Sequence, residues 1–132
     1  MANIIAKIEK INEISELYKF FYKDTCDSTG TILIHHGKAK YPGKYVKDYS
    51  KIKLFEKTPE AKKILKEKAG EIFKKYNFNS LLAVHNIGTI YKNDPILFLA
   101  VESVDRETGF KGMREFLEFI KSEKILGLEE IK

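Results

Sequence analysis

The sequence predicts a fold of the α+β class, whose second half runs strand, turn, strand, helix. Residues 81–87 and 96–104 are apolar runs typical of buried strands, and a Lys-Asn-Asp-Pro turn signal at 92–95 separates them. Residues 105–122 then repeat apolar side chains at three- and four-residue spacing, which indicates an amphipathic helix. These three observations establish that both strands and helices contribute to the core.

The N-terminal segment, residues 3–22, allows two interpretations. Its apolar residues from Ile4 to Phe21 follow helical spacing, which favours one continuous helix. However, Asn12 followed by Glu13 is a helix-start signal in the middle of that segment. We therefore favour a short strand near 3–9 and a helix near 12–23, with the continuous helix as the alternative.

The next elements are two strands joined by a basic loop. Residues 31–36 are apolar and β-prone, and lie between Gly30 and Gly37. The loop 38–49 is rich in lysine and tyrosine and contains the turn pair Pro42-Gly43. Residues 50–56 alternate, with Ile52 and Leu54 on one face, which predicts a half-buried strand.

A helix is predicted at 59–76, with Thr58 as its N-cap and Pro59 as its first residue. The expected buried stripe of this helix has 3.6-residue spacing and consists of Ala61, Ile64, Leu65, Ala69, Ile72 and Phe73.

The next clear strand, 81–87, is expected to end at Gly88.

The strand at 96–104 is almost continuously apolar, so we expect it at the centre of the sheet, covered on both faces. Asp105 or a near neighbour should cap the last helix, which runs to about Ser122. The tail from Glu123 is mixed and predicts a loop or a short extra turn. The expected core stripe of the last helix is Phe110, Met113, Phe116, Leu117 and Ile120.

The bulk properties favour a single domain spanning 1–132, located in the cytoplasm. A chain of 132 residues suits one hydrophobic core. No apolar run approaches the roughly 20 residues that cross a bilayer, and the N-terminus has no signal-peptide pattern. The 24 basic and 19 acidic residues give a net charge of +5, which suits anionic partners such as phosphates, nucleic acid or an acidic protein.

The sequence lacks the motifs of several common catalytic sites. The chain has no phosphate-binding glycine loop, no zinc-ligand spacing and no nucleophile elbow, and we expect no resident cofactor or metal. His35 and His36 are adjacent on a strand, so they point to opposite faces and cannot chelate one ion, and His85 stands alone in an apolar strand. Cys26 lies between Asp24 and Asp27, whose charges disfavour a thiolate nucleophile.

The remaining candidates are basic residues near element ends. Lys38 and Lys40 follow a strand on a glycine-containing loop, and Arg106 lies at the N-terminus of the last helix, where an anion is favoured. Asp105 could cap that helix or orient Arg106. Lys121 ends the helix beside its buried stripe, so we expect partial desolvation, which would suit an acid, base or nucleophile. The alternative is a cation that complements the helix C-terminus.

The stretch from Gly30 to Lys121 resembles the large, catalytic subunit of molybdopterin synthase, the MoaE-like family. The resemblance covers about two-thirds of the chain, in the family's order and spacing. Its most specific parts are a strand with a His-x-Ile-Gly sequence, a strand ending before an arginine, and a helix ending in a lysine. The matching pieces are 30–40, 54–65, 83–88, Asp94, 101–106 and 116–121.

The resemblance implies an α/β hammerhead fold, a mostly antiparallel sheet with helices packed on it. It also implies a sulfurtransferase that needs no cofactor of its own. Sulfur would move from the C-terminal thiocarboxylate of a small ubiquitin-like partner ending in Gly-Gly to cyclic pyranopterin monophosphate, and two transfers would form the molybdopterin dithiolene. Two large subunits would form a central homodimer, with one small subunit at each end of the heterotetramer.

The resemblance also assigns roles to residues. Lys121 matches the family's essential catalytic lysine, Arg106 matches a substrate-binding arginine, and Lys40 stands where the family usually has an arginine. Lys38 and Asp105 are expected beside the substrate, although Asp105 replaces the usual histidine. A second functional lysine is expected where this chain has Leu128, and Lys124 is the nearest substitute. These departures leave a non-catalytic relative open as an alternative.

Two further expectations come from the residues themselves. If Arg106 and Lys121 share one helix, they are 15 positions or roughly 22 Å apart, so either the ligand pocket spans two chains or one of the two residues is not in it. We favour a pocket in which Arg106 reaches across a homodimer interface to the partner's Lys121 pocket. The loop 40–51 also alternates lysines with Tyr41, Tyr45 and Tyr49. That pattern allows a nucleic-acid-binding module as the less favoured function, with tyrosines stacking on bases.

Overall fold

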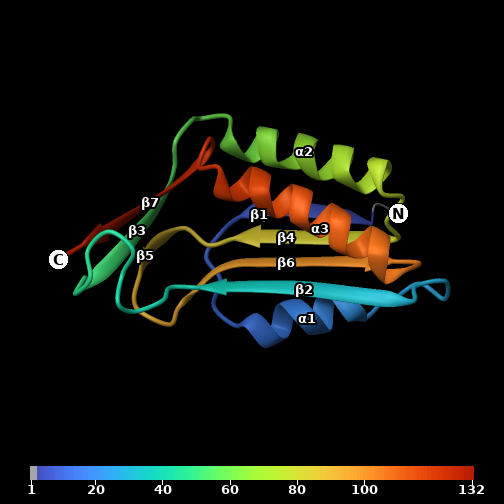
Figure 1. The fold of residues 1–132 in the computed structure, drawn as a ribbon, viewed down its shortest axis with the longest axis horizontal. Helices are drawn as coiled ribbons and strands as arrows, with labels where there is room; N and C mark the ends of the chain where they lie inside the picture. Colours follow the sequence, from blue (N-terminus) through green and yellow to red (C-terminus); the bar gives the residue numbers. More distant parts are fainter. Residues whose placement is uncertain (1–2) are drawn as a thin grey trace.

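The computed structural model describes residues 3–132, which form two sheets and three helices (Figure 1). The large sheet has the order β1-β4-β6-β2 and the small sheet the order β5-β3-β7. This architecture is the expected α+β fold. The elements are β1 (Ile4–Ile8), α1 (Ile14–Tyr22), β2 (Thr31–Lys38), β3 (Lys51–Glu56), α2 (Ala61–Lys75), β4 (Ser80–His85), β5 (Gly88–Ile90), β6 (Pro95–Ser103), α3 (Arg106–Lys121) and β7 (Leu126–Ile131).

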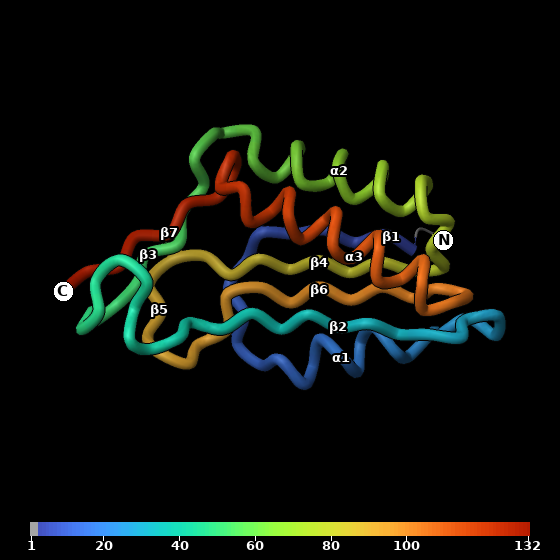
Figure 2. The backbone as a smooth tube through the Cα atoms, viewed as in Figure 1, coloured from blue at the N-terminus to red at the C-terminus, as the bar shows by residue number. Residues whose placement is uncertain are grey.

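The sheets are mostly antiparallel, as expected. In the large sheet, β6 pairs antiparallel with both β4 and β2, while β1 pairs parallel with β4. In the small sheet, β3 pairs antiparallel with both β5 and β7. The small sheet lies beyond one end of the large sheet, where the C-terminus is also found (Figure 2).

The large sheet is covered on both faces, with α2 and α3 on one and α1 on the other (Figure 1). Side chains of β6 alternate between the two cores, because Leu97, Leu99 and Val101 contact the α2 and α3 side while Phe98 and Ala100 contact the α1 side. The prediction of a central strand buried on both faces is therefore confirmed.

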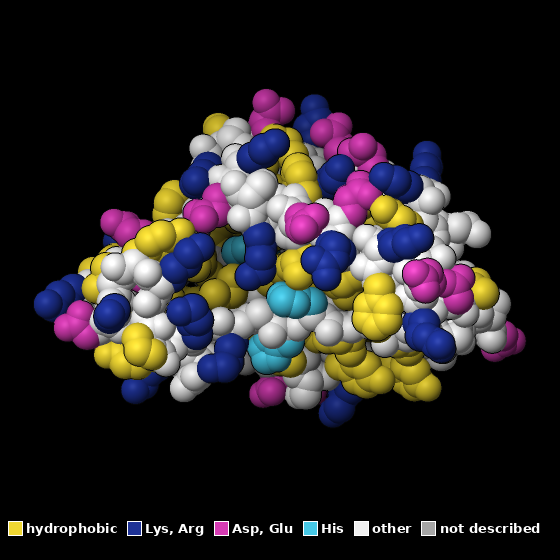
Figure 3. Space-filling view, viewed as in Figure 1, with side chains coloured by type: hydrophobic (Ala, Val, Ile, Leu, Met, Phe, Trp, Pro, Cys, Tyr) yellow, Lys and Arg dark blue, Asp and Glu magenta, His cyan; other side chains and the backbone are white. Residues whose placement is uncertain are grey.

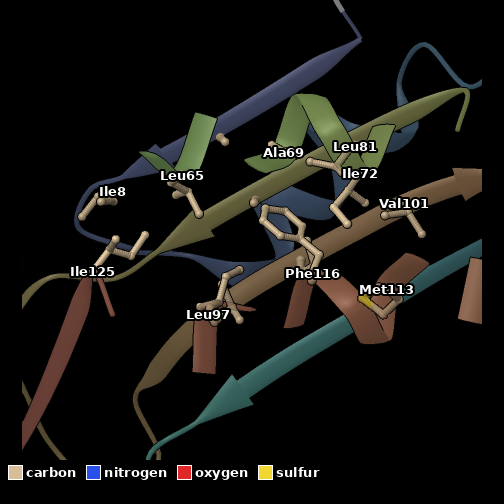
Figure 4. Close-up of a cluster of buried hydrophobic side chains, with 14 of the residues drawn as sticks. Ile8, Leu65, Ala69, Ile72, Leu81, Leu97, Val101, Met113, Phe116 and Ile125 are labelled. Carbon is tan, nitrogen blue, oxygen red and sulfur yellow. The ribbon is translucent and has the colours of Figure 1, made fainter. Parts of the chain in front are cut away.

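Phe116 lies at the middle of the larger core, facing side chains of α2 and the sheet (Figure 4). The α2 stripe is as predicted, although Ile64 and Phe73 are only half-buried. The α3 stripe is wrong at one position: Phe110 is 59% exposed, because it lies outside the face of α3 that meets the sheet.

The N-terminal segment adopts the favoured interpretation. Residues of β1 pair with β4 from Ile4 opposite Leu81 to Ile8 opposite His85, and α1 starts only at Ile14. The continuous helix is wrong, because residues 4–8 pair with the edge of β4 and bury Ala6 and Ile8 in the larger core.

Three local predictions need correction. The helix predicted at 59–76 begins at Ala61, because Thr58 and Pro59 form a turn in which the Ala61 N–H donates to the Thr58 carbonyl at 3.1 Å. Its N-cap residue, Glu60, makes no side-chain capping bond. The strand predicted at 81–87 ends at His85, and Gly88 opens β5 with a φ of 91°.

The tail after Glu123 is also corrected, because it forms β7 rather than a loop or turn. Leu126 and Leu128 pair with Glu56 and Leu54 of β3, which lies about 70 residues earlier in the chain. A mixed sequence such as Leu-Gly-Leu-Glu-Glu-Ile becomes a strand here because a partner strand is available in the tertiary structure.

The glycine in the middle of α3 gives a test of this packing. A Cβ on Gly112 would lie 2.3 Å from Cζ of Phe78 and 3.0 Å from Cδ2 of Tyr76. We expect Gly112→Ala to lower the free energy of unfolding by about 1.5 kcal/mol, because the aromatic rings must move. The matched control is Gly70→Ala in α2, where nothing lies within 4 Å, and it should raise that free energy by up to about 1 kcal/mol. Urea unfolding of both variants measures the difference in sign.

Candidate functional site

A cavity of about 310 Å³ lies where the large and small sheets meet, and we call it the lysine cavity. Figure 3 shows a hollow on this side of the molecule, with basic side chains around it and histidine within it. Its polar and charged lining comes from β2, the loop after β2, β4, β7 and the end of α3. These lining residues are His35, Lys38, Lys40, Lys44, Tyr45, His85, Lys121, Glu123 and Glu130.

Four lysines surround this cavity, and they come from three parts of the chain: the end of β2, the basic loop and the end of α3. Lys38 ends β2, and its Nζ donates to Oδ1 of Asn93 at 2.7 Å. Lys40 and Lys44 lie on the basic loop, where Lys40 Nζ donates to the Pro42 carbonyl at 3.3 Å. Lys121 is the last residue of α3. Together they give the cavity a positive lining that suits an anionic ligand.

Lys121 lies in the cavity lining but is exposed, so the expected partial desolvation is wrong for the single chain. Its neighbour Ile120 is 4% exposed and anchors the end of α3 in the core. Lys121 follows directly and projects from the edge of that buried stripe. The ammonium group is therefore positioned by a rigid helix while remaining accessible to a ligand.

Glu130 of β7 gives the basic loop its shape. Its Oε1 accepts from the backbone N–H groups of Tyr45 and Val46, each at 2.7 Å, and its Oε2 accepts from that of Lys44 at 2.9 Å. Burial alone would raise the pKa of Glu130, but these three donors, together with the charge of Lys40, hold that pKa below its ordinary value of 4.5. The ionised carboxylate thus fixes Lys44 beside the cavity.

Two histidines lie in the lining, both with a lowered pKa. Burial is the main cause for each, and the charges of Lys121 and His36 add to the effect at His35. Nδ1 of His85 lies 2.7 Å from the Asn86 carbonyl oxygen. Because that oxygen can only accept, Nδ1 carries the proton and Nε2 of the neutral ring is an acceptor. The cavity therefore combines fixed cations with neutral imidazoles.

The lowered pKa of His85 predicts how stability depends on pH. Between the folded pKa and the ordinary value of 6.5, the unfolded chain binds more protons than the folded chain, so stability is lost as pH falls below about 6.5 toward the folded pKa. We expect His85→Gln to reduce this slope by up to about 1.4 kcal/mol per pH unit. Urea unfolding across that range measures it, with the exposed His36→Gln as control. An unchanged slope in His85→Gln contradicts the assignment.

The cavity brings together three of the predicted site residues, Lys38, Lys40 and Lys121. Asp105 and Arg106 lie at the other end of α3, about 22 Å away along the helix axis, and are not in its lining. Lys124 is exposed and also lies outside the lining. Within one chain, therefore, only part of the predicted set meets.

Asp105 performs the predicted capping role. Its Oδ1 accepts from the Thr108 backbone N–H at 2.8 Å, and its Oδ2 accepts from the Thr108 hydroxyl at 3.2 Å. These two bonds are the main reason that the pKa of Asp105 lies below its ordinary value. Arg106 follows as the first residue of α3 and is exposed.

Sequence reasoning missed Lys44, Glu130 and both histidines as parts of the site. A titratable residue in an apolar strand could have marked His85 as a candidate. Because His85 is far from Lys121 in sequence, however, nothing indicated that the two line the same cavity. Glu130 could not be found because β7 was not predicted. The position at which the resemblance places the second lysine, Leu128, does lie in the cavity lining.

The lining offers little to a resident metal ion. Within residues 3–132, no group of three or more His, Cys, Asp or Glu side chains is arranged to hold one. No helix in the same range is long and apolar enough to cross a membrane.

The nucleic-acid interpretation is weakened, because Tyr49 is only 5% exposed and its hydroxyl donates to the Lys40 carbonyl at 2.7 Å. It packs in the core and cannot stack on a base.

The sequence model of the family described as MoaE protein matches residues 7–123. The chain belongs to this family. A molybdopterin synthase from Staphylococcus aureus has the same fold, with a TM-score of 0.76 and 26% identity, over 98% of this chain and 89% of that chain. No curated protein matches the chain significantly.

Two more distant structures share the MoaE fold. A MoaE protein from Burkholderia ambifaria has a TM-score of 0.76 at 16% identity, over 99% of this chain and 89% of that one. A complex of subunits 1 and 2 of molybdopterin-converting factor from Helicobacter pylori has a TM-score of 0.69 at 13% identity, over 98% and 84%. At these identities the likeness concerns the fold alone. The resemblance noted in the sequence, and the fold it implied, are thereby confirmed.

Proposed function

We propose that this MoaE-family chain is the catalytic subunit of a molybdopterin synthase, located in the cytoplasm and active as a sulfurtransferase. The observation that carries the proposal is the convergence of Lys38, Lys40, Lys44 and Lys121 on one cavity in a chain of this family. The substrate would be cyclic pyranopterin monophosphate, and the sulfur donor would be a partner's C-terminal thiocarboxylate. Residues 1–132 would act as one domain.

The positive lining suits this chemistry because both reactants are anions. Bringing a phosphate and a thiocarboxylate together in one cavity costs free energy that fixed cations reduce. Lys38 and Lys40 would hold the phosphate, as point charges rather than as the bidentate fork of an arginine. Lys121 would lie at the reacting centre, where an ammonium group can orient or protonate the intermediate.

The family's second lysine is replaced by Leu128, yet the cavity does not lack a further cation. Lys44 lines the same cavity, and its backbone N–H is held by Glu130 at 2.9 Å. We assign Lys44, rather than Lys124, as the residue that supplies the missing charge. The alternative of a non-catalytic relative rests on the same substitution, so the activity test below decides between the two.

A homodimer would complete the site. β2 is an edge strand of the large sheet, and α3 packs along it, with Gly109 over Leu33. If two β2 edges pair antiparallel about a two-fold axis, the start of α3 in one chain lies toward the end of α3 in the other. Thr31 at the start of β2 pairs with Ser103 near Arg106, whereas Lys38 at its end lies in the lysine cavity. The partner subunit's Arg106 would then approach Lys121.

The sulfur donor is proposed to be a small ubiquitin-like subunit ending in Gly-Gly. The Helicobacter pylori relative is a complex of two subunits, which supports a two-protein enzyme. An extended glycine tail is narrow enough to enter a cavity of about 310 Å³ between the sheets. One small subunit on each chain of the homodimer gives a heterotetramer.

Reconstitution tests the proposal. The chain is mixed with a thiocarboxylated small subunit and the pterin precursor, and the dithiolene product is measured. Product formation that depends on both additions supports the enzyme. Formation of a complex without product supports the non-catalytic relative, and the absence of both product and complex refutes the proposed function. A salt titration with single-stranded oligonucleotide serves as the control for nucleic-acid binding.

A further inference from the structure

We propose that the free edge of β1 and the groove beside it bind an extended peptide segment from a partner protein, with acidic side chains at alternate positions. The segment would add a strand to the large sheet. This site lies at the opposite edge of the sheet from β2 and shares no lining residue with the lysine cavity. It is therefore independent of the proposed sulfur transfer.

The backbone of β1 has one side without a partner strand in the part of the chain that the structure describes. β1 is the terminal strand in the order of the large sheet. On its inner side, the Leu81 N–H donates to the Asn3 carbonyl at 2.8 Å and the Glu9 N–H donates to the His85 carbonyl at 3.0 Å. In a parallel ladder, alternate residues bond to the same neighbour, so the N–H and C=O groups of Ile4, Ala6 and Ile8 face outward.

A groove of about 670 Å³ runs along this edge, and we call it the edge groove. One wall is residues 4–9, and the other is the row Lys62, Lys66 and Gly70 on α2. These three residues are spaced four apart, so they follow one line along the helix surface. The groove therefore combines free main-chain hydrogen-bonding groups, which give strand addition its affinity, with a row of cationic side chains that would select for acidic residues.

The spacing of the cations matches an extended chain. Lys62 and Lys66 are separated by four helical residues, or about 6 Å along α2. Alternate side chains on one face of a strand are about 6.6 Å apart. An added strand with carboxylates at positions i and i+2 would thus place one beside each lysine. Glu9 is the single acidic lining residue, and its Oε2 is already 3.6 Å from Lys7 Nζ.

Gly70, at the end of the lysine row, independently supports a ligand in the edge groove. It lies inside α2, where glycine costs about 1 kcal/mol relative to alanine. Nothing lies within 4 Å of a Cβ built on it, so no contact within the described chain requires a glycine there. The missing side chain leaves the groove open at the end of the lysine row. Space for another backbone is a physical reason for glycine at this position.

A second copy of this chain fits the edge groove poorly. Pairing two β1 edges would bring the Lys62 and Lys66 rows of both copies to the same interface, where like charges repel. The residues that β1 would offer as a strand, Ile-Ile-Ala-Lys-Ile, contain no carboxylate. Charge complementarity therefore selects an acidic partner segment.

Fluorescence anisotropy with a labelled synthetic peptide, Thr-Val-Glu-Val-Glu-Val-Thr, tests the site on the full chain. We expect saturable binding that weakens as salt rises and at least tenfold weaker binding of the peptide with lysine in place of glutamate. A peptide N-methylated at alternate amides should lose binding similarly, because it cannot complete the ladder. Amide resonances of Ile4, Ala6 and Ile8 should shift on binding. Shifts confined to the lysine cavity, or equal binding of the lysine peptide, would overturn the proposal.

Two variants separate docking from folding. Nothing lies within 4 Å of a Cβ built at Gly70, so Gly70→Leu should keep or raise the melting temperature and yet fill the groove and weaken the peptide at least tenfold. Lys62→Glu with Lys66→Glu should do the same through charge, whereas Lys63→Glu, an exposed residue outside the groove, should change binding less than twofold. Unchanged affinity in Gly70→Leu would refute the site. Product formation by the reconstituted enzyme should be unaffected by Gly70→Leu, which keeps this test distinct from that of the proposed function.

Discussion

Replacing Lys121 with alanine should lower product formation in the reconstituted enzyme by at least about 100-fold. Removal of a preorganised group that stabilises charge at the reacting centre typically costs a factor of this size or more. Lys121 is exposed at the end of α3, so the substitution should leave the fold intact. Single-turnover rates and circular dichroism of the same preparation measure the two effects separately.

Complementation tests whether each site combines two chains. Arg106→Ala alone should also reduce activity, since the partner's Arg106 is proposed to complete the site. In a mixture of equal amounts of Lys121→Ala and Arg106→Ala chains, half of the dimers are mixed, and each mixed dimer holds one intact site. Activity should therefore recover to about a quarter of the wild-type value.

The control for complementation is Lys124→Ala. Lys124 is exposed close to Lys121 in sequence, but lies outside the lysine cavity, so its loss should change the rate less than about threefold. Recovery of no activity in the mixture, while both single variants are inactive and dimeric, would contradict the shared site. A rate in Lys121→Ala equal to that of the wild type would remove Lys121 from the chemistry.

Replacing Glu130 with alanine should lower the free energy of unfolding by about 2–3 kcal/mol. The carboxylate accepts three backbone N–H bonds from residues 44–46, and hydrogen bonds to charged groups are among the stronger ones in proteins. Without it the basic loop loses its anchor to β7. Amide exchange at Tyr45 and Val46 should accelerate, and phosphate binding in the lysine cavity should weaken because Lys44 is no longer positioned.

The pH dependence of this anchor has a definite sign. The folded pKa of Glu130 lies below 4.5, so its contribution is complete above the unfolded pKa and is lost as pH falls through the folded value. Wild-type stability should therefore decline below about pH 5, and Glu130→Ala should show a shallower decline. Glu129→Ala is the matched control, since Glu129 is exposed on the other face of β7. An equal loss of stability in both variants would show that the anchor is not responsible.

Much of the fold could be predicted from local patterns. The spacing of apolar residues located α3, the continuous run at 96–104 identified the central strand, and the cap was expected at Asp105 or a near neighbour. These features depend on neighbours within a few residues, so one sequence contains all the information needed. Lys38, Lys40 and Lys121 were also candidates because each stands at the end of such an element.

Other features depended on partners far away in the chain. Residues 126–131 become β7 because β3 pairs with them, and residues 88–90 become β5 for the same reason. Without β7, neither Glu130 nor the wall of the lysine cavity could be expected. The edge groove likewise required knowing that β1 ends the large sheet and that α2 lies beside it.

By itself, therefore, the sequence determined the class of the fold, most of its elements and the cationic character of the site, because propensity, capping and apolar periodicity are local properties of the chain. Only the tertiary structure decided that Lys121 shares a cavity with Lys44 and His85. The length of α3 could be calculated from residue spacing once the helix was predicted, but the strand pairing that builds the cavity around Lys121 could not, because it depends on partners far away in the chain.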